Sequence, residues 1–194
     1  MGAATPFGQR QNGELSADAV RYSCRRLRRV WLLTLIIVVM ACDQATKVAV
    51  RAHLRDAAPR EYAGLLTLLY TENAGAFLSL GSDLPSPARR VVFDGLVTVG
   101  LAVAAWFLFA GKIRGRGDDI ALALVIGGGA ANLIDRIRFN GYVTDFLYLH
   151  AGPLHTGVFN VADMAITGGV LWLMLAWLLP RKPSGKSAIT DGVH

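Results

Sequence analysis

Residues 30–50 read VWLLTLIIVVMACDQATKVAV, a nearly continuous apolar run that is long enough to cross a membrane. A helix needs about 20 mostly apolar residues to span the hydrocarbon core of a bilayer. Residues 91–110, 120–137 and 159–179 form further runs of this kind, although the run over 120–137 ends in polar residues. We therefore predict an all-α membrane protein with four spans.

The overall composition agrees with a membrane protein. Of 194 residues, 53% are hydrophobic and 18% are charged, and the mean hydropathy is +0.40. A soluble domain would carry more charge and shorter apolar runs. The net charge is +6, but its basic residues gather beside the expected spans, which favours anionic lipid and not nucleic acid as the partner. These residues are Arg21, Arg25, Arg26, Arg28, Arg29, Lys112, Arg114, Arg116, Arg181, Lys182 and Lys186.

The positions of the basic clusters predict the topology. With four spans, the clusters before the first span, between the second and third, and after the fourth lie on one side of the membrane. The positive-inside rule places that side in the cytoplasm, so both termini are expected there in a bacterial inner membrane. The first outer loop also carries arginines, among them Arg51 and Arg55, partly offset by acidic residues. We expect a disordered tail over residues 1–29, a four-span domain over 30–180 and a second tail over 181–194.

A second interpretation of the N-terminal region concerns Cys42. Residues 39–42 read VMAC after a basic and then an apolar segment, which is similar to a lipidation site, and on this interpretation the chain is itself a lipoprotein anchored at Cys42. However, the apolar pattern continues to Val50, and the later spans make a lipid anchor redundant. The topology separates Cys24 from Cys42, so no disulfide is expected. The histidines are scattered, and no metal site is predicted.

Polar residues within the spans lie on one side of the membrane. Ionisable groups at membrane depth are costly, so each is a functional candidate. The cytoplasmic halves of the spans hold no comparable set, and we therefore predict a polar site just below the outer surface. Its candidate residues are Asp43, Lys47, Asn132, Asp135, Arg136, Asn160 and Asp163, with Asp145 in the loop before the fourth span.

Spacing separates supporting acids from catalytic candidates. Asp43 precedes Lys47 by four residues, the favourable order for a helical ion pair, and Asp135 adjoins a basic residue. These two acids are expected to stay ionised and structural. Two facing carboxyl groups that share a proton can activate water, which favours Asp145 with Asp163. Taken alone, Asp145 is equally an ordinary loop acid, and Asp163 equally a helix-terminal acid that favours the dipole.

Five blocks along the chain together resemble lipoprotein signal peptidases, the signal peptidase II family of intramembrane aspartyl proteases. The blocks are DQATK at 43–47, NAGAF at 73–77, GGGAANLIDR at 127–136, VTDF at 143–146 and FNVAD at 159–163. Ala131 stands where a glycine is commoner in the family, and Met164 stands where serine is usual. Each block alone is weak, but five in order on the expected topology are specific.

The resemblance implies a fold and a reaction. It implies a small extended-strand platform on the outer face, which residues 61–80 fit, and Asp145 and Asp163 as the catalytic pair. The implied substrate is a diacylglyceryl-modified prolipoprotein, cut just before its lipid-bearing cysteine, without a metal or organic cofactor. We expect a monomer in the bilayer with no nucleic-acid partner. Residues expected to support or bind substrate are Asp43, Lys47, Asn73, Asn132, Asp135, Arg136 and Asn160.

Two other functions compete with this prediction. A proton-coupled transporter would use buried carboxylates as a relay, but the polar groups stop short of the cytoplasmic side. A non-enzymatic scaffold would leave the paired carboxylates unexplained.

Overall fold

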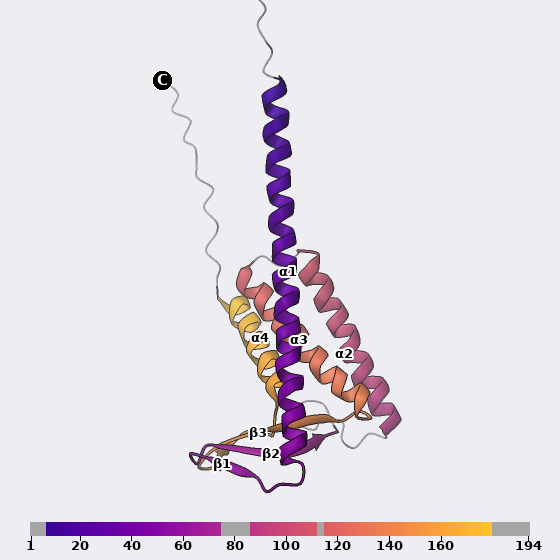
Figure 1. Cartoon of the computed structure of the whole chain (residues 1–194), viewed down its shortest axis with the longest axis vertical. Helices are drawn as coiled ribbons and strands as arrows, with labels where there is room; N and C mark the ends of the chain where they lie inside the picture. Colours follow the sequence, from indigo (N-terminus) through magenta and orange to yellow (C-terminus); the bar gives the residue numbers. More distant parts are fainter. Residues whose placement is uncertain (1–6, 75–85, 112–114, 180–194) are drawn as a thin grey trace, which may run out of the picture.

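The computed structural model describes residues 7–74, 86–111 and 115–179. Four long helices stand beside one another, and a small sheet lies across one end of the bundle (Figure 1). The first helix extends well beyond the other three at the opposite end (Figure 1). The helices are α1 (Phe7–Leu54), α2 (Ser86–Phe109), α3 (Arg116–Arg138) and α4 (Val161–Leu178).

Helix α1 begins far earlier than the sequence predicted. It starts at Phe7, whereas residues 1–29 were expected to form a disordered tail. No proline interrupts residues 7–54, and the first one after the helix is Pro59. Once the apolar span is helical, each preceding residue adds a backbone hydrogen bond without a new nucleus. The helix therefore extends into the polar segment before it.

Three helices among the described residues are long and apolar enough to cross a membrane. The segments that qualify are Tyr22–Leu54, Arg116–Arg138 and Val161–Leu178, whereas the apolar part of α2, Asp94–Phe109, is shorter. The span of α4 is only 11% buried inside the protein, so its apolar side chains face outward, as lipid contact requires. The coarse prediction of a helical membrane protein is confirmed, and the count of four spans stays a prediction.

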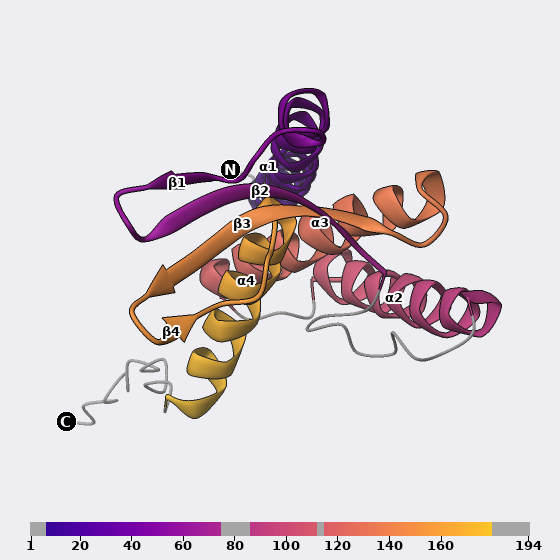
Figure 2. The ribbon, with the colours of Figure 1, turned by 90° about the horizontal axis from the view of Figure 1, so that it is seen from below.

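The sheet is antiparallel and contains four strands in the order β1-β2-β3-β4. Figure 2 shows it from below, crossing the ends of the helices. Helices α2 and α3 separate β2 from β3 in the sequence, so the sheet joins two distant parts of the chain. The strands are β1 (Arg60–Tyr62), β2 (Leu66–Asn73), β3 (Val143–Ala151) and β4 (Leu154–His155).

This sheet confirms the expected platform in part and corrects one prediction. Residues 61–73 supply β1 and β2, whereas residues 75–80 of the expected platform lie outside the described residues. Asp145 was expected in a loop, but it lies within β3. Pairing with β2 supplies backbone partners to the segment 143–151, and this is why it is a strand.

The pairing of β2 with β3 contains an irregularity next to Asp145. Leu68 pairs with Leu147, but the register then shifts, so that Thr71 pairs with Asp145 and Asn73 with Val143. An extra residue in one strand of a pair bends that strand and redirects its side chains. The shift brings the end of β2 alongside the start of β3.

Close helix contacts bring α3 and α4 together. A Cβ atom on Gly128 would lie 2.5 Å from the backbone oxygen of Ala162, and one on Gly169 would lie 2.5 Å from that of Ala121. Glycine is therefore needed at both crossings, as the small-residue faces predicted. This contact places the start of α4 next to the last turns of α3.

Candidate functional site

A buried ion-pair centre lies where α1 meets α3. Lys47 Nζ lies 2.7 Å from Asp43 Oδ2 and 3.2 Å from Asp135 Oδ2, and it donates to Asn132 Oδ1 at 2.8 Å. Lys47 and both carboxylates are 0% exposed. A buried ammonium group needs an acceptor for each of its three N–H bonds. Asn132 and Asp135 belong to α3, so their contacts with Lys47 hold α1 and α3 in one relative position.

Asp43 also holds the first turn of α4. Its Oδ1 accepts a hydrogen bond from the backbone N–H of Ala162 at 2.8 Å. The first N–H groups of a helix have no partner within the helix, and their end carries a partial positive charge. The Asp43 carboxylate therefore joins α1 to α4 as well as to Lys47. The expected pair of Asp43 with Lys47 is present, and its reach is wider than the sequence suggested.

The start of α4 is closed by a capping box. Asn160 Oδ1 accepts from the backbone N–H of Asp163 at 2.9 Å, and Asp163 Oδ2 accepts from the backbone N–H of Asn160 at 3.1 Å. This reciprocal pair satisfies two N–H groups and fixes the Asp163 side chain. Asn132 Nδ2 donates to the other oxygen, Asp163 Oδ1, at 2.9 Å. The carboxyl group of Asp163 is thus held on both sides.

Asp145 is held by two asparagine amides. Asn160 Nδ2 donates to its Oδ1 at 2.6 Å, and Asn73 Nδ2 donates to its Oδ2 at 2.9 Å. Only 2% of Asp145 is exposed. The strand shift in β2 brings Asn73 into reach, and the N-terminal turn of α4 brings Asn160. The sheet and the bundle therefore meet at this carboxyl group.

Asn160 contacts both candidate catalytic acids at once. Its side chain donates to Asp145, and its backbone N–H donates to Asp163. Burial, and next the negative charge of Asp163, raise the pKa of Asp145 from 3.8 to about 6, although the hydrogen bonds from Asn73 and Asn160 oppose this rise. A buried carboxyl group beside a second negative charge takes up a proton more readily than an isolated one.

Some of the site's contacts were not apparent from the sequence. Asp135 was expected to pair with the adjacent Arg136, but the structure places its Oδ2 3.0 Å from Arg51 Nη2 and near Lys47. Gln44 Nε2 donates to Asp135 Oδ1 at 3.0 Å. Asn132 was expected to support the candidate catalytic acids, and it donates to one of them, Asp163, from the facing helix. Arg51 and Gln44 are the two residues of these contacts that the sequence analysis did not assign to the site. Of the two, only Gln44 carried a sequence signal, as part of the block 43–47.

The arrangement suits acid–base chemistry. Two carboxyl groups from different elements lie on either side of Asn160 at the end of an apolar bundle, and each is oriented by N–H donors. Among the described residues, no group of three or more metal-ligating side chains is present. The geometry can activate a water molecule and protonate a leaving group.

Comparisons with known proteins agree with this chemistry. A family model described as signal peptidase (SPase) II matches residues 35–179. The chain is 38% identical to a lipoprotein signal peptidase of Rhizorhabdus wittichii over 175 residues, which cover 87% of this chain and 98% of the relative. A lipoprotein signal peptidase of Sphingopyxis alaskensis is 37% identical over 77% of this chain and 86% of its own length.

Solved structures share the fold. A bacterial membrane enzyme superposes with a TM-score of 0.67 at 22% sequence identity, covering 77% of this chain and 94% of that one. The family match over residues 35–179 includes the second part of α1, the other three helices and the sheet. The chain therefore belongs to the signal peptidase II family of lipoprotein signal peptidases.

Proposed function

We propose that Asp145 and Asp163 are the catalytic pair of this signal peptidase II. The enzyme removes the signal peptide from diacylglyceryl-modified prolipoproteins by cutting just before the lipidated cysteine. The observation that carries the proposal is the double contact of Asn160, which donates to the carboxyl groups of both Asp145 and Asp163. Gln44 joins Asp43 and Asp135 in a similar way, but the positively charged Lys47 lies against both of those carboxylates, an arrangement that suits a structural ion pair.

The reaction requires one proton on the pair. The ionised carboxyl group takes a proton from water while the water oxygen attacks the scissile carbonyl carbon. The protonated carboxyl group donates its proton to the carbonyl oxygen and so stabilises the developing charge. When the tetrahedral intermediate collapses, the C–N bond breaks, and the nitrogen of the leaving amine takes the proton that the base had received. One hydroxyl group of the intermediate returns its proton to the other carboxylate as the C=O bond re-forms, so that the pair again holds one proton.

The surrounding residues are proposed to orient this pair. Asn132 and Asn160 hold Asp163, and Asn73 and Asn160 hold Asp145. The ion-pair centre of Asp43, Lys47 and Asp135 holds the helices beneath them. Arg136 closes the same end of α3 and is proposed to contact substrate. None of these groups needs to change its protonation state for turnover.

The placement of the site suits a substrate that is itself in the membrane. The sheet and the catalytic pair lie at one end of the bundle, and we propose that this end faces outward, with four spans below it and both termini in the cytoplasm. A lipidated cysteine is anchored at the same level, so the scissile bond reaches the pair without leaving the interface. We propose that a monomer suffices, because both acids belong to one chain.

An apolar core disfavours the transporter alternative. Ion pairs do occur at the other end of the bundle, where Arg28 Nε donates to Asp119 Oδ2 at 2.7 Å. However, buried Leu32, Ile36 and Leu108 pack between the two ends with residues of α3. A proton relay needs a continuous chain of polar groups or water. This apolar layer interrupts it.

Substitution of the two acids tests the proposal. Asp145→Asn, Asp163→Asn and the double variant should each lose cleavage of a lipidated prolipoprotein by about three orders of magnitude or more, with the double scarcely worse than either single, because the pair acts as a unit. Asp56→Asn, an exposed acid near the sheet, is the matched control and should cleave normally. Wild-type turnover in either single variant would reassign the chemistry to Asp43 or Asp135.

A further inference from the structure

We propose that Arg51 is a positioning residue of the peptidase, which holds strand β3 and thereby aims the carboxyl group of Asp145. This inference rests on the proposed catalytic role of Asp145. Arg51 lies in the last turn of α1 and outside the five sequence blocks that resemble the family. Its contacts, and not a motif, point to the role.

The guanidinium group of Arg51 touches three separate parts of the fold. Its Nε donates to Thr144 Oγ1 on β3 at 2.9 Å, and its Nη2 lies 3.0 Å from Asp135 Oδ2 on α3. Its central carbon lies 4.0 Å from the centroid of the Phe139 ring, in the turn between α3 and β3. Only 17% of the side chain is exposed. A planar group with donors along its edge and a flat face can make all three contacts together, and a lysine cannot.

Two hydrogen bonds hold Thr144, one through its side chain and one through its backbone. Its hydroxyl oxygen accepts from Arg51, and its backbone N–H donates to Asp135 Oδ2 at 3.1 Å. Arg51 and Asp135 also form an ion pair, so that Arg51, Thr144 and Asp135 are each in contact with the other two. These contacts join β3 to α1 and α3 at the residue directly before Asp145.

The contacts that hold Thr144 also determine the direction of the Asp145 side chain. Successive side chains of a strand point to opposite faces. With Thr144 held against α1 and α3, the Asp145 side chain is directed the other way, toward the amides of Asn73 and Asn160. Because a misplacement of about 1 Å at a catalytic group can cost about a hundredfold in rate, a shift of β3 should lower turnover without changing how substrate binds.

The test measures kcat and KM for a lipidated prolipoprotein, with full-length enzyme in detergent. Arg51→Gln and Thr144→Val should each lower kcat by about tenfold to a hundredfold with KM changed less than about twofold, and the double variant should be scarcely worse than the stronger single. Arg51→Lys should not restore kcat, because it keeps the charge and loses the planar edge. Thr144→Ser keeps the hydroxyl acceptor and should be close to wild type.

Arg28 provides the matched control. It is also an arginine of α1 paired with an aspartate of α3, but its partner is Asp119 at the far end of the bundle. Arg28→Gln should leave kcat unchanged and should combine additively with Thr144→Val. An equal loss of kcat in Arg28→Gln would mean that Arg51 only stabilises the bundle, and this would overturn the proposal.

Two further outcomes would also contradict the positioning role. These are wild-type kcat in Arg51→Gln, and a double variant whose loss equals the product of the two single losses. If Arg51→Gln does not fold, Thr144→Val and Thr144→Ser decide the matter alone. If Asp145→Asn is inactive while the Arg51 and Thr144 variants are normal, only this inference fails. If Asp145→Asn cleaves normally, the proposed catalytic pair fails.

Discussion

At the scale of single residues, the site depends on amide groups that orient carboxyl groups. Asn160 is fully buried, and it caps α4, contacts Asp145 and contacts Asp163. A carboxyl group held by N–H donors on both oxygens keeps one direction in both of its protonation states. Asn132 does the same for Asp163 from α3. In the proposed mechanism the asparagines therefore supply geometry, and the aspartates supply the exchangeable proton.

The raised pKa of Asp145 predicts a pH dependence of cleavage. Burial and the charge of Asp163 raise this pKa to about 6, so Asp145 carries a proton below that pH and loses it above. The reaction needs one proton on the pair, and kcat/KM should therefore fall as the pH rises above about 6 in the free enzyme. A profile of kcat/KM against pH for a lipidated prolipoprotein measures this fall. A flat profile between pH 5 and about 8 would contradict it.

The same group affects stability with a defined sign. Between its ordinary pKa of 3.8 and its raised value of about 6, Asp145 holds more protons in the folded than in the unfolded protein. The free energy of unfolding should therefore decrease as the pH rises through this window and stay lower above it. Asp145→Asn should lack this decrease. Thermal unfolding of both proteins in detergent at the two ends of the window makes the comparison.

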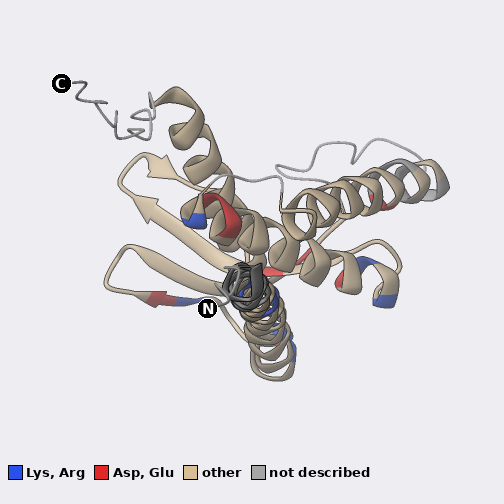
Figure 3. Ribbon diagram, turned by 90° about the horizontal axis from the view of Figure 1, so that it is seen from above, with Lys and Arg blue, Asp and Glu red and all other residues tan. Residues whose placement is uncertain are grey.

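At the scale of elements, α4 is the part of the fold that assembles the site. Its N-terminal turn is held by its own capping box and by Asp43 from α1. Its body packs on α3 through Gly128 and Gly169, where backbone replaces side chain in the contact. Figure 3 looks along the bundle and shows basic residues on α1 and acidic residues at the start of α3. Because α4 is held in this way, its capped end places Asp163 near Asp145 of β3.

Two adjacent glycines of α4 test this close packing. A Cβ on Gly169 would meet the backbone oxygen of Ala121 at 2.5 Å, whereas a Cβ on Gly168 would meet nothing within 4 Å. Gly169→Ala should destabilise the protein by about 1–3 kcal/mol through overpacking. Gly168→Ala should be neutral or stabilise by up to about 1 kcal/mol, because alanine favours a helix more than glycine does.

Unfolding in detergent compares the two glycine variants directly. Cleavage should also decrease in Gly169→Ala, because α4 carries Asp163. Equal stability of the two variants would show that α3 and α4 can move apart to accommodate a Cβ atom at position 169, and this would contradict the prediction.

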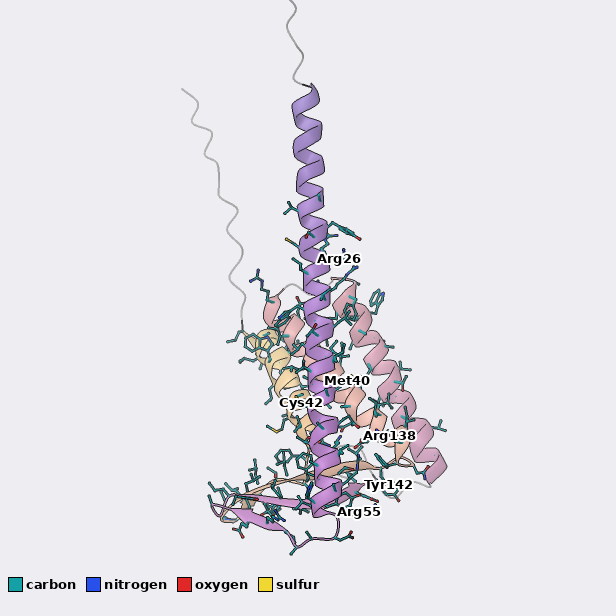
Figure 4. The ribbon with its side chains drawn as sticks, in the orientation of Figure 1. Arg26, Met40, Cys42, Arg55, Arg138 and Tyr142 are labelled. Atoms are coloured by element: carbon teal, nitrogen blue, oxygen red, sulfur yellow. The ribbon has the colours of Figure 1, made fainter. Side chains whose placement is uncertain are left out.

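At the scale of the whole molecule, the sheet and the extension of α1 mark opposite ends. Figure 4 shows Arg26 where α1 extends beyond the other helices, and Arg55 with Tyr142 beside the sheet at the opposite end. Apolar side chains are widely exposed between these ends, among them Val99, Trp106 and Leu171. Such a surface is stable only against lipid. The protein therefore spans a bacterial membrane with its site at one face.

Single-cysteine labelling tests which face is outside. In a background that lacks Cys24 and Cys42, Leu154→Cys places a thiol on the exposed sheet, and Arg26→Cys places one on the extended part of α1. A membrane-impermeant reagent should label position 154 in intact spheroplasts, and position 26 only after the membrane is opened, because the positive-inside rule predicts that the basic end faces the cytoplasm. The reverse pattern would overturn the proposed topology.

The sequence alone determined the membrane class and the family, and it supplied the candidate residues of the site. Apolar runs of spanning length report a solvent preference that no tertiary contact can reverse, and the five blocks carry the acids and asparagines in order. The small-residue faces of the third and fourth spans also predicted their close packing, because glycine spacing is a local property of a helix.

Only the tertiary structure decided which groups meet. Asp135 contacts Lys47 and Arg51, which are both distant from it in sequence. Asn132 donates a hydrogen bond to Asp163 on another helix. Strand β3 pairs with β2 across about 70 residues of chain, a separation over which no periodicity carries information. The contacts of Arg51 arise in the same way, because they depend on three elements that packing alone brings together.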